Sequence, residues 1–79
     1  MSLSVNELKC GFSGKSIEVR VSNPGTSYES FRYECVYSLS GGGEKAVSGS
    51  AALDPGKSSV VATEVADRPI SGVVAKSIW

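Results

Sequence analysis

Two cysteines are the residues of this chain whose type and placement point most directly to chemistry. Cys10 and Cys35 are the only cysteines, and each lies on the inward-facing parity of an alternating apolar segment. Two such positions suit an inter-sheet disulfide, which in the chain-entropy model adds about 3 kcal/mol. The alternatives are two buried thiols, which would pack as small hydrophobes, and a redox-active pair. No Cys-x-x-Cys spacing or neighbouring cation supports the redox pair, so we predict a Cys10–Cys35 disulfide.

Catalytic and metal-binding chemistry finds little support in the remaining residues. The chain has no histidine, which excludes a His-ligated metal, a Ser-His-Asp triad and a Cys-His pair. Asp54, Glu64 and Asp67 lie at turns or on outward faces, where solvated surface charge is favoured over acid–base pairing or calcium ligation. The glycines at 41–43 precede no helix and no Lys-Ser/Thr pair, so they indicate a hairpin tip rather than a phosphate site. We predict a non-enzymatic protein with no catalytic residue, no cofactor and no metal site.

Length and charge limit the classes of partner. The chain has 79 residues, which is enough for one small domain, so we expect a single β-sandwich domain over residues 1–79. We expect residues 1–4 to be flexible or a remnant of cloning. Lys plus Arg and Asp plus Glu are both 8, and this balance argues against nucleic acid and membrane surfaces as partners. No apolar run approaches the ~20 residues of a membrane span, which leaves a protein partner.

Clusters of Gly, Pro, Asn and Asp divide the chain at short, even intervals. The clusters are 11–14, 23–25, 41–43, 54–56 and 67–69. The segments between them alternate apolar and polar residues with a period of two, and valine outnumbers leucine, 10 to 4. Both features favour short antiparallel strands. We therefore predict an all-β fold without helices, a small antiparallel sandwich of six to seven strands.

Alternation is strongest in the second and third segments. The inward set is Ile17, Val19, Val21, Phe31, Tyr33, Cys35, Tyr37 and Leu39. If these segments form a hairpin, Val21 pairs with Phe31 and the outward charges form one patch. The candidate partner-binding residues are Glu18, Arg20, Arg32 and Glu34 of this patch, together with the loop residue Tyr28.

The other segments are less regular. Val47 to Leu53 has a thin inward face with Gly49 in it, which is typical of an edge strand. Residues 58–63 and 71–76 resemble each other, and we interpret them as two strands of similar burial. A bulge or kink near Asn6 and Glu7 would reconcile the two parities of the first segment. Trp79 is expected to cover the core rather than stand exposed.

Several of these motifs together resemble a known family. Residues 17–25, an aromatic-rich strand and then residues 53–58 are similar to the immunoglobulin-type sandwich domains of bacterial secreted proteins. The glycines at 41–43 in a small serine-rich domain also resemble the periplasmic chaperones that restrain curli amyloid subunits. Those chaperones carry a Cys-x-Cys pair or another cysteine placement, from which this chain departs. The resemblance implies a fold and no functional residue.

The expected function follows from scaffold and resemblance together. We expect a non-enzymatic extracytoplasmic binding module, periplasmic or secreted, monomeric, with a signal peptide that is not part of this sequence. Its function is expected on the loops 23–30, 40–45 and 66–70 of a rigid sandwich. The alternative is a chaperone-like inhibitor of amyloid or subunit assembly, which would act through the charged sheet face or through an edge strand.

Overall fold

A computed structural model describes residues 7–79 of the chain. Six strands account for most of these residues, and no helix occurs among them. The strands are β1 (Leu8–Ser13), β2 (Ser16–Ser22), β3 (Glu29–Leu39), β4 (Glu44–Leu53), β5 (Ser58–Val65) and β6 (Ile70–Ile78). The predictions for residues 1–4 and for a kink at Asn6 fall outside the described residues.

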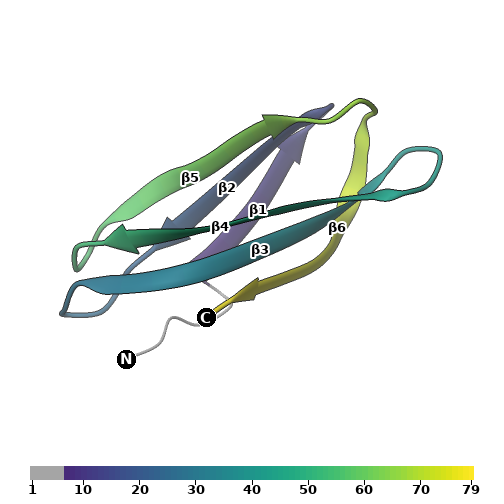
Figure 1. The fold of residues 1–79 in the computed structure, drawn as a ribbon. Helices are drawn as coiled ribbons and strands as arrows, with labels where there is room; N and C mark the ends of the chain where they lie inside the picture. The colour runs from purple at the N-terminus through teal and green to yellow at the C-terminus, as the bar shows by residue number, and fades with distance from the viewer. Residues whose placement is uncertain (1–6) are drawn as a thin grey trace.

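The strands form two three-stranded antiparallel sheets packed face to face (Figure 1). Sheet A has the order β1-β2-β5, and sheet B has the order β4-β3-β6. The packed sheets form an elongated body with principal extents of 43 × 16 × 16 Å. The predicted all-β sandwich is confirmed with six strands, and β4 is an edge strand as expected. Within residues 7–79 no helix is long and apolar enough to cross a membrane.

The core follows the period-two pattern closely, because side chains on a strand point alternately to its two faces. The inward residues of β2 and β3 are all buried: Ile17, Val19, Val21, Phe31, Tyr33, Cys35, Tyr37 and Leu39. Their neighbours Glu18, Arg20 and Arg32 are exposed, and Glu34 is half-buried. The parity predicted for both strands is confirmed, and the two central strands carry most of the core.

The predicted pairing of β2 with β3 is wrong. Val21 pairs with Leu8 of β1 and Ser59 of β5, whereas Phe31 pairs with Ala51 of β4. The connection between β2 and β3 therefore carries the chain from sheet A to sheet B. Alternation decides which residues face the core, and it leaves open which strand lies alongside.

Asn23 holds the connection by which the chain crosses between the sheets. Its side chain is buried, and its Nδ2 donates to the carbonyl oxygens of Ser27 at 3.0 Å and Leu53 at 2.9 Å. Its Oδ1 accepts from the Gly25 N–H, and its backbone N–H donates to Lys57 O. One buried amide thus holds the connections 23–28 and 54–57 together at one end of the sandwich.

The remaining connections meet at the other end. Glycines with positive φ at 41–43 form the hairpin tip between β3 and β4, as predicted. Arg68 reaches this hairpin and donates to Ser40 O at 3.2 Å, and Ile70 N–H donates to Gly14 O. The three loops expected to carry function are therefore divided: 23–30 lies at one end, and 40–45 and 66–70 lie together at the other.

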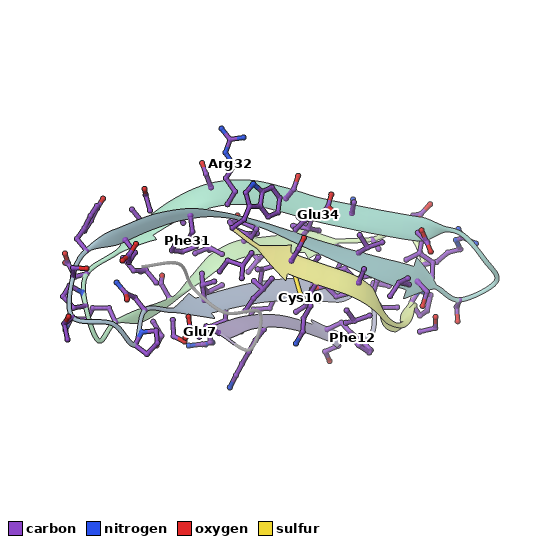
Figure 2. All side chains as sticks on the ribbon, turned by 90° about the horizontal axis from the view of Figure 1, so that it is seen from below. Glu7, Cys10, Phe12, Phe31, Arg32 and Glu34 are labelled. Atoms are coloured by element: carbon purple, nitrogen blue, oxygen red, sulfur yellow. A yellow bond between two sulfur atoms is a disulfide. The ribbon has the colours of Figure 1, made fainter. Side chains whose placement is uncertain are left out.

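The disulfide predicted from the sequence is present. Cys10 of β1 and Cys35 of β3 are joined across the two sheets, with their Cα atoms 5.9 Å apart. Figure 2 shows the yellow sulfur bond spanning the layers at Cys10. Cys35 is fully buried and Cys10 is half-buried, so one sulfur-bearing residue borders the surface.

Candidate functional site

The outer face of sheet B combines a charged strand with an exposed indole. Arg32 projects away from the core in Figure 2, and Phe31 beside it turns inward. Arg32 and Trp79 exchange two backbone hydrogen bonds, of 2.7 and 2.9 Å, which hold Trp79 alongside β3. The Trp79 side chain is 61% exposed. The prediction that Trp79 covers the core is therefore wrong, because the backbone pairing places it beyond the buried Ile78.

Small side chains on β4 leave shallow grooves beside Trp79. One groove, of about 780 Å³, is lined by Ser30, Phe31, Arg32, Ser50, Ala51, Ala52 and Trp79. A second groove, of about 430 Å³, includes Glu34, Ser48 and Gly49 and shares Arg32 and Trp79 with the first. Serine, alanine and glycine project little from the sheet, so the indole and the guanidinium stand above their surroundings. This face offers an aromatic ring and both signs of charge to a partner.

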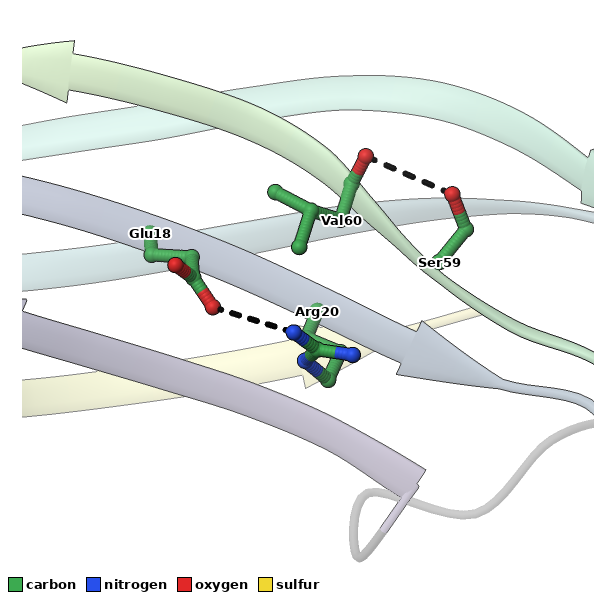
Figure 3. A network of polar contacts seen from close by, with 4 residues as sticks. All are labelled: Glu18, Arg20, Ser59 and Val60. Carbon is green, nitrogen blue, oxygen red and sulfur yellow. Dashed lines mark hydrogen bonds and ion pairs between the residues drawn. The ribbon is translucent and has the colours of Figure 1, made fainter.

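The outer face of sheet A carries the other predicted pair. Arg20 Nη2 lies 3.5 Å from Glu18 Oε1, and both side chains are about half exposed (Figure 3). Ser59 on the neighbouring β5 donates to Val60 O. Exposed pairs of this kind contribute little to stability, about 0–1 kcal/mol. Glu18 and Arg20 neutralise each other, and the exposed Lys9, which pairs with Arg20 on the neighbouring β1, adds a positive charge to the same face.

The four charged residues therefore do not form the single patch predicted for them. Glu18 and Arg20 point outward from sheet A, while Arg32 and Glu34 point outward from sheet B. The outer faces of two packed sheets lie on opposite sides of a sandwich. Tyr28 is 63% exposed in the connection between the sheets and belongs to neither pair.

One side of the sandwich is closed by an ion pair that the sequence did not reveal. We call this side of the sandwich the β4/β5 flank, because the edge strands β4 and β5 face each other there. Lys45 pairs with Tyr37, and Glu64 pairs with Ile17, so both charged residues have inward parity. Lys45 Nζ lies 3.2 Å from Glu64 Oε1 across the gap. Glu64 was expected at a turn or on an outward face, and this prediction is wrong, because its pairing with the buried Ile17 gives it inward parity. Its meeting with Lys45 depends on which strands face each other, which alternation does not reveal.

The opposite side, the β1/β6 flank, has a different construction. The disulfide joins β1 to the central strand β3. Tyr37 Oη donates to Gly11 O at 3.1 Å, and the Tyr37 ring meets Phe12 edge to face. Burial raises the pKa of the Tyr37 hydroxyl, which keeps it a neutral hydrogen-bond donor. All of these links run from β3 to β1, and none of them involves β6.

A groove of about 390 Å³ remains at this flank. It is lined by Cys10, Val73, Val74, Ala75 and Lys76. Val73 and Val74 are 39% and 53% exposed, and Phe12 nearby on β1 is 44% exposed. The β1/β6 flank thus presents apolar side chains over the disulfide, with one lysine among them.

The described residues show no convergence of groups suited to catalysis. No group of three or more His, Cys, Asp or Glu side chains could hold a metal ion within residues 7–79. Asp54 and Asp67 are exposed, and Glu64 is paired with Lys45. The geometry that stands out is instead that of open surfaces: the outer face of sheet B and the β1/β6 flank.

Comparison with known proteins adds no assignment. No family model matches the chain, and neither curated proteins nor solved structures give a match. The likeness to immunoglobulin-type domains thus remains a prediction from turn and strand motifs. The surfaces formed by the six strands are therefore the basis for a functional proposal.

Proposed function

We propose that the chain is a non-enzymatic protein-binding module whose contact surface is the outer face of sheet B. The observation that carries this proposal is the exposed Trp79 held beside Arg32 by two backbone hydrogen bonds. Tryptophan and arginine are enriched among the residues that dominate binding energy at protein interfaces. On this face the scaffold holds both in place through the β3 ladder.

The surrounding surface supports the same proposal. Grooves on both sides of Arg32 are floored by serine, alanine and glycine, so a partner's side chains can approach the indole closely. Glu34 adds a negative charge on the same strand, which gives the face a charge pattern that a partner can match. The outer face of sheet A, by contrast, presents the internally paired Glu18 and Arg20.

The proposed setting is extracytoplasmic. A disulfide between Cys10 and Cys35 suits an oxidising compartment, such as a periplasm or the exterior of a cell. We place the module on an immunoglobulin-like sandwich and expect it to act as a monomer. A small domain that depends on its disulfide would hold a rigid contact face in such a compartment without any bound cofactor.

The experiment compares matched residues on the two outer faces. The immobilised domain is crosslinked to proteins of its source extract. Bound proteins are quantified for the wild type and for the variants Arg32→Ala, Trp79→Ala, Arg20→Ala and Tyr28→Ala. We expect the partner to be lost with Arg32→Ala and Trp79→Ala and retained with Arg20→Ala and Tyr28→Ala. Circular dichroism checks that each variant stays folded. Equal loss with Arg20→Ala, or retention with both Arg32→Ala and Trp79→Ala, contradicts the proposal.

A chaperone-like inhibitor of amyloid or subunit assembly is the second candidate. The observation favouring it is β6, an edge strand to which no strand of residues 7–79 is bonded on its outer side. Strand edges pair with extended segments of other chains. The test is the lag time of an amyloid-forming subunit with substoichiometric domain at low and high salt. Inhibition that collapses at high salt supports action through charges. A lag time that is unchanged at both salt concentrations removes this candidate.

A further inference from the structure

The backbone of β6 offers unused hydrogen-bonding groups in a defined place. Trp79 is bonded to Arg32 in both directions, and bonded pairs alternate along an antiparallel ladder. Ser77 is therefore the next residue of β6 whose N–H and C=O face β3. The N–H and C=O groups of Lys76 and Ile78 face the other way. Among the described residues, no backbone hydrogen bond reaches them from that side.

The usable part of this edge is short and has regular pairing. The pairing between β3 and β6 shifts register twice, opposite 36/37 and opposite 38/39 of β3. Residues 75–78 lie beyond both irregularities and pair in unbroken register with residues 33–36. Bulges disrupt an edge for strand pairing. Residues 75–78 therefore form the segment of β6 that can accept another strand.

The charge of the β1/β6 flank indicates which kind of strand could pair with β6. Among the residues of β1 and β6 with inward parity, Lys76 is the charged one, since Lys9 of β1 pairs with Arg20 on the outer face of sheet A. Lys76 pairs with Cys35, so it has the parity of the inner face, and it is exposed beside the disulfide in the groove. No ion pair to Lys76 is present among residues 7–79. A strand added to β6 would bury this lysine and would need to supply a carboxylate.

The same lysine disfavours a second copy of this chain. Two β6 edges paired antiparallel through residues 75–78 would place the two Lys76 side chains on neighbouring positions of one sheet. Like charges on adjacent strands are destabilising. Inward-pointing lysines are one device by which natural edge strands avoid pairing with themselves. Lys76 therefore disfavours pairing between two β6 strands and favours pairing with a strand that carries a carboxylate.

We propose that residues 75–78 of β6 bind an extended segment of a partner protein as an additional strand of sheet B. The segment carries apolar side chains on its inward face, which fill the groove over Cys10 and Val73, and one carboxylate among them, which pairs with Lys76. This inference rests on the proposed function, protein binding, and adds a second surface and the chemistry of its ligand.

Amide hydrogen exchange read by NMR tests the geometry directly. In the free domain, the Lys76 and Ile78 amides should exchange quickly and the Ser77 amide slowly. The probe is a capped peptide, Thr-Val-Thr-Glu-Thr-Val-Thr, at high concentration. We expect it to slow exchange at Lys76 and Ile78 with little change at Ser77. The same peptide N-methylated at alternate residues cannot complete the ladder and should give no protection.

Charge variants test the role of Lys76. We expect Lys76→Gln to weaken peptide binding by about fivefold, the size of a cross-strand charge pair. Lys76→Glu should bind the peptide in which Lys replaces Glu and should no longer bind the original. Lys45→Gln is the matched control, since it removes an inward-parity lysine from the edge strand of the other flank. A loss of binding with Lys45→Gln equal to that with Lys76→Gln contradicts the proposal.

Other occupants of the edge give distinct results. Protection of the Lys76 amide in the free domain that rises with protein concentration would show that a second copy occupies the edge. Protection independent of concentration would show that another part of the chain covers it. Either result overturns the inference, as does a peptide that protects neither amide. If the crosslinked partner is still lost with Arg32→Ala in those cases, the proposed function stands without this second surface.

Discussion

At the β4/β5 flank the edge strands are joined directly by Lys45 and Glu64, whereas at the β1/β6 flank the covalent link runs from β1 to β3 and bypasses β6. A tyrosine of β3 reaches sheet A on each side: Tyr33 Oη donates to Val61 O of β5, and Tyr37 Oη donates to Gly11 O of β1. The central strand thus secures both edges of sheet A. The difference lies in the edges of sheet B, since β4 is tied across the gap and β6 is left open.

The two edge strands of sheet B therefore illustrate two different roles: one closes the sandwich, and the other is available for pairing with a further strand. The edge strand β4 is joined to sheet A by a side-chain contact, in which its inward Lys45 pairs with Glu64 of the same chain. An edge whose inward lysine is unmatched is protected against copies of itself and remains available to a complementary strand. The disulfide supports this arrangement, because it links β1 to β3 directly.

The largest effect should come from removing the covalent link of the β1/β6 flank. The double variant Cys10→Ala, Cys35→Ala should lose about 3 kcal/mol, because the bridge closes a loop of 25 residues. In a domain of this size that lowers the Tm by at least about ten degrees. Thermal unfolding followed by circular dichroism measures it. Adding reductant to the wild type should reproduce the loss and should not affect the variant; an unchanged wild-type Tm on reduction would refute the prediction.

Two glycines give a smaller, matched contrast between the flanks. A Cβ added at Gly49 of β4 would lie 2.6 Å from Tyr33 Oη and 3.0 Å from Cζ, so the ring must move. We expect Gly49→Ala to cost about 1–3 kcal/mol, as overpacking does.

At Gly11 of β1, the added Cβ meets only Glu18 O at 3.6 Å, an ordinary contact. Gly11→Ala should therefore be neutral or should stabilise by up to about 1 kcal/mol, through the unfolded chain. Urea unfolding of both variants measures the contrast. A Gly49→Ala variant as stable as Gly11→Ala would show that Tyr33 is free to move away from β4.

Tyr37 makes the β1/β6 flank sensitive to alkaline pH. Burial raises the pKa of its hydroxyl above the usual value of 10.0, so the unfolded chain loses this proton first. Its contribution to stability is complete below the unfolded pKa and is lost as pH rises through the folded pKa. We expect unfolding free energy to fall above about pH 10, and to fall less steeply in Tyr37→Phe. At neutral pH that variant should lose about 1 kcal/mol with the hydrogen bond to Gly11 O. Equal alkaline slopes would remove Tyr37 as the cause.

The smallest effect belongs to the ion pair of the β4/β5 flank. Lys45 and Glu64 keep 33% and 43% of their side-chain surface exposed. A double-mutant cycle with Lys45→Ala and Glu64→Ala should give a coupling of about 0.2–1 kcal/mol. The coupling should shrink in high salt. A coupling that high salt leaves unchanged would mean that the pair is shielded from water more than its exposure indicates.

Much of this architecture could be predicted from the sequence because one side of each strand must be buried. The alternation in β2 and β3 identified their core residues, and the inward cysteines identified the disulfide. The turn clusters placed the six strands within a few residues of their observed bounds. These are local consequences of period-two burial, and they do not depend on which strands are neighbours.

The surfaces could not be predicted in the same way, because they depend on pairing. A hairpin of β2 and β3 and a crossing between sheets give identical alternation, so alternation cannot distinguish them. The crossing is accompanied by buried bonds of Asn23 that join the connections 23–28 and 54–57. Trp79 was misplaced because its exposure follows from its bonds to Arg32 rather than from its hydrophobicity. The sequence does not show that Lys76 has inward parity, because this follows from its pairing with Cys35.

Asn23 also determines where this scaffold tolerates new sequence. Its bonds to Gly25, Ser27, Leu53 and Lys57 unite two loops, so a peptide inserted into either one would disturb the other. At the opposite end, a Cβ added at Gly42 would meet no atom within 4 Å, and Gly42 lies in a hairpin of positive-φ glycines. A foreign epitope grafted there would leave β3, the disulfide and both flanks in place. The two ends of the sandwich should therefore differ in their tolerance of inserted sequence, since one end depends on a buried side chain and the other presents an exposed glycine hairpin.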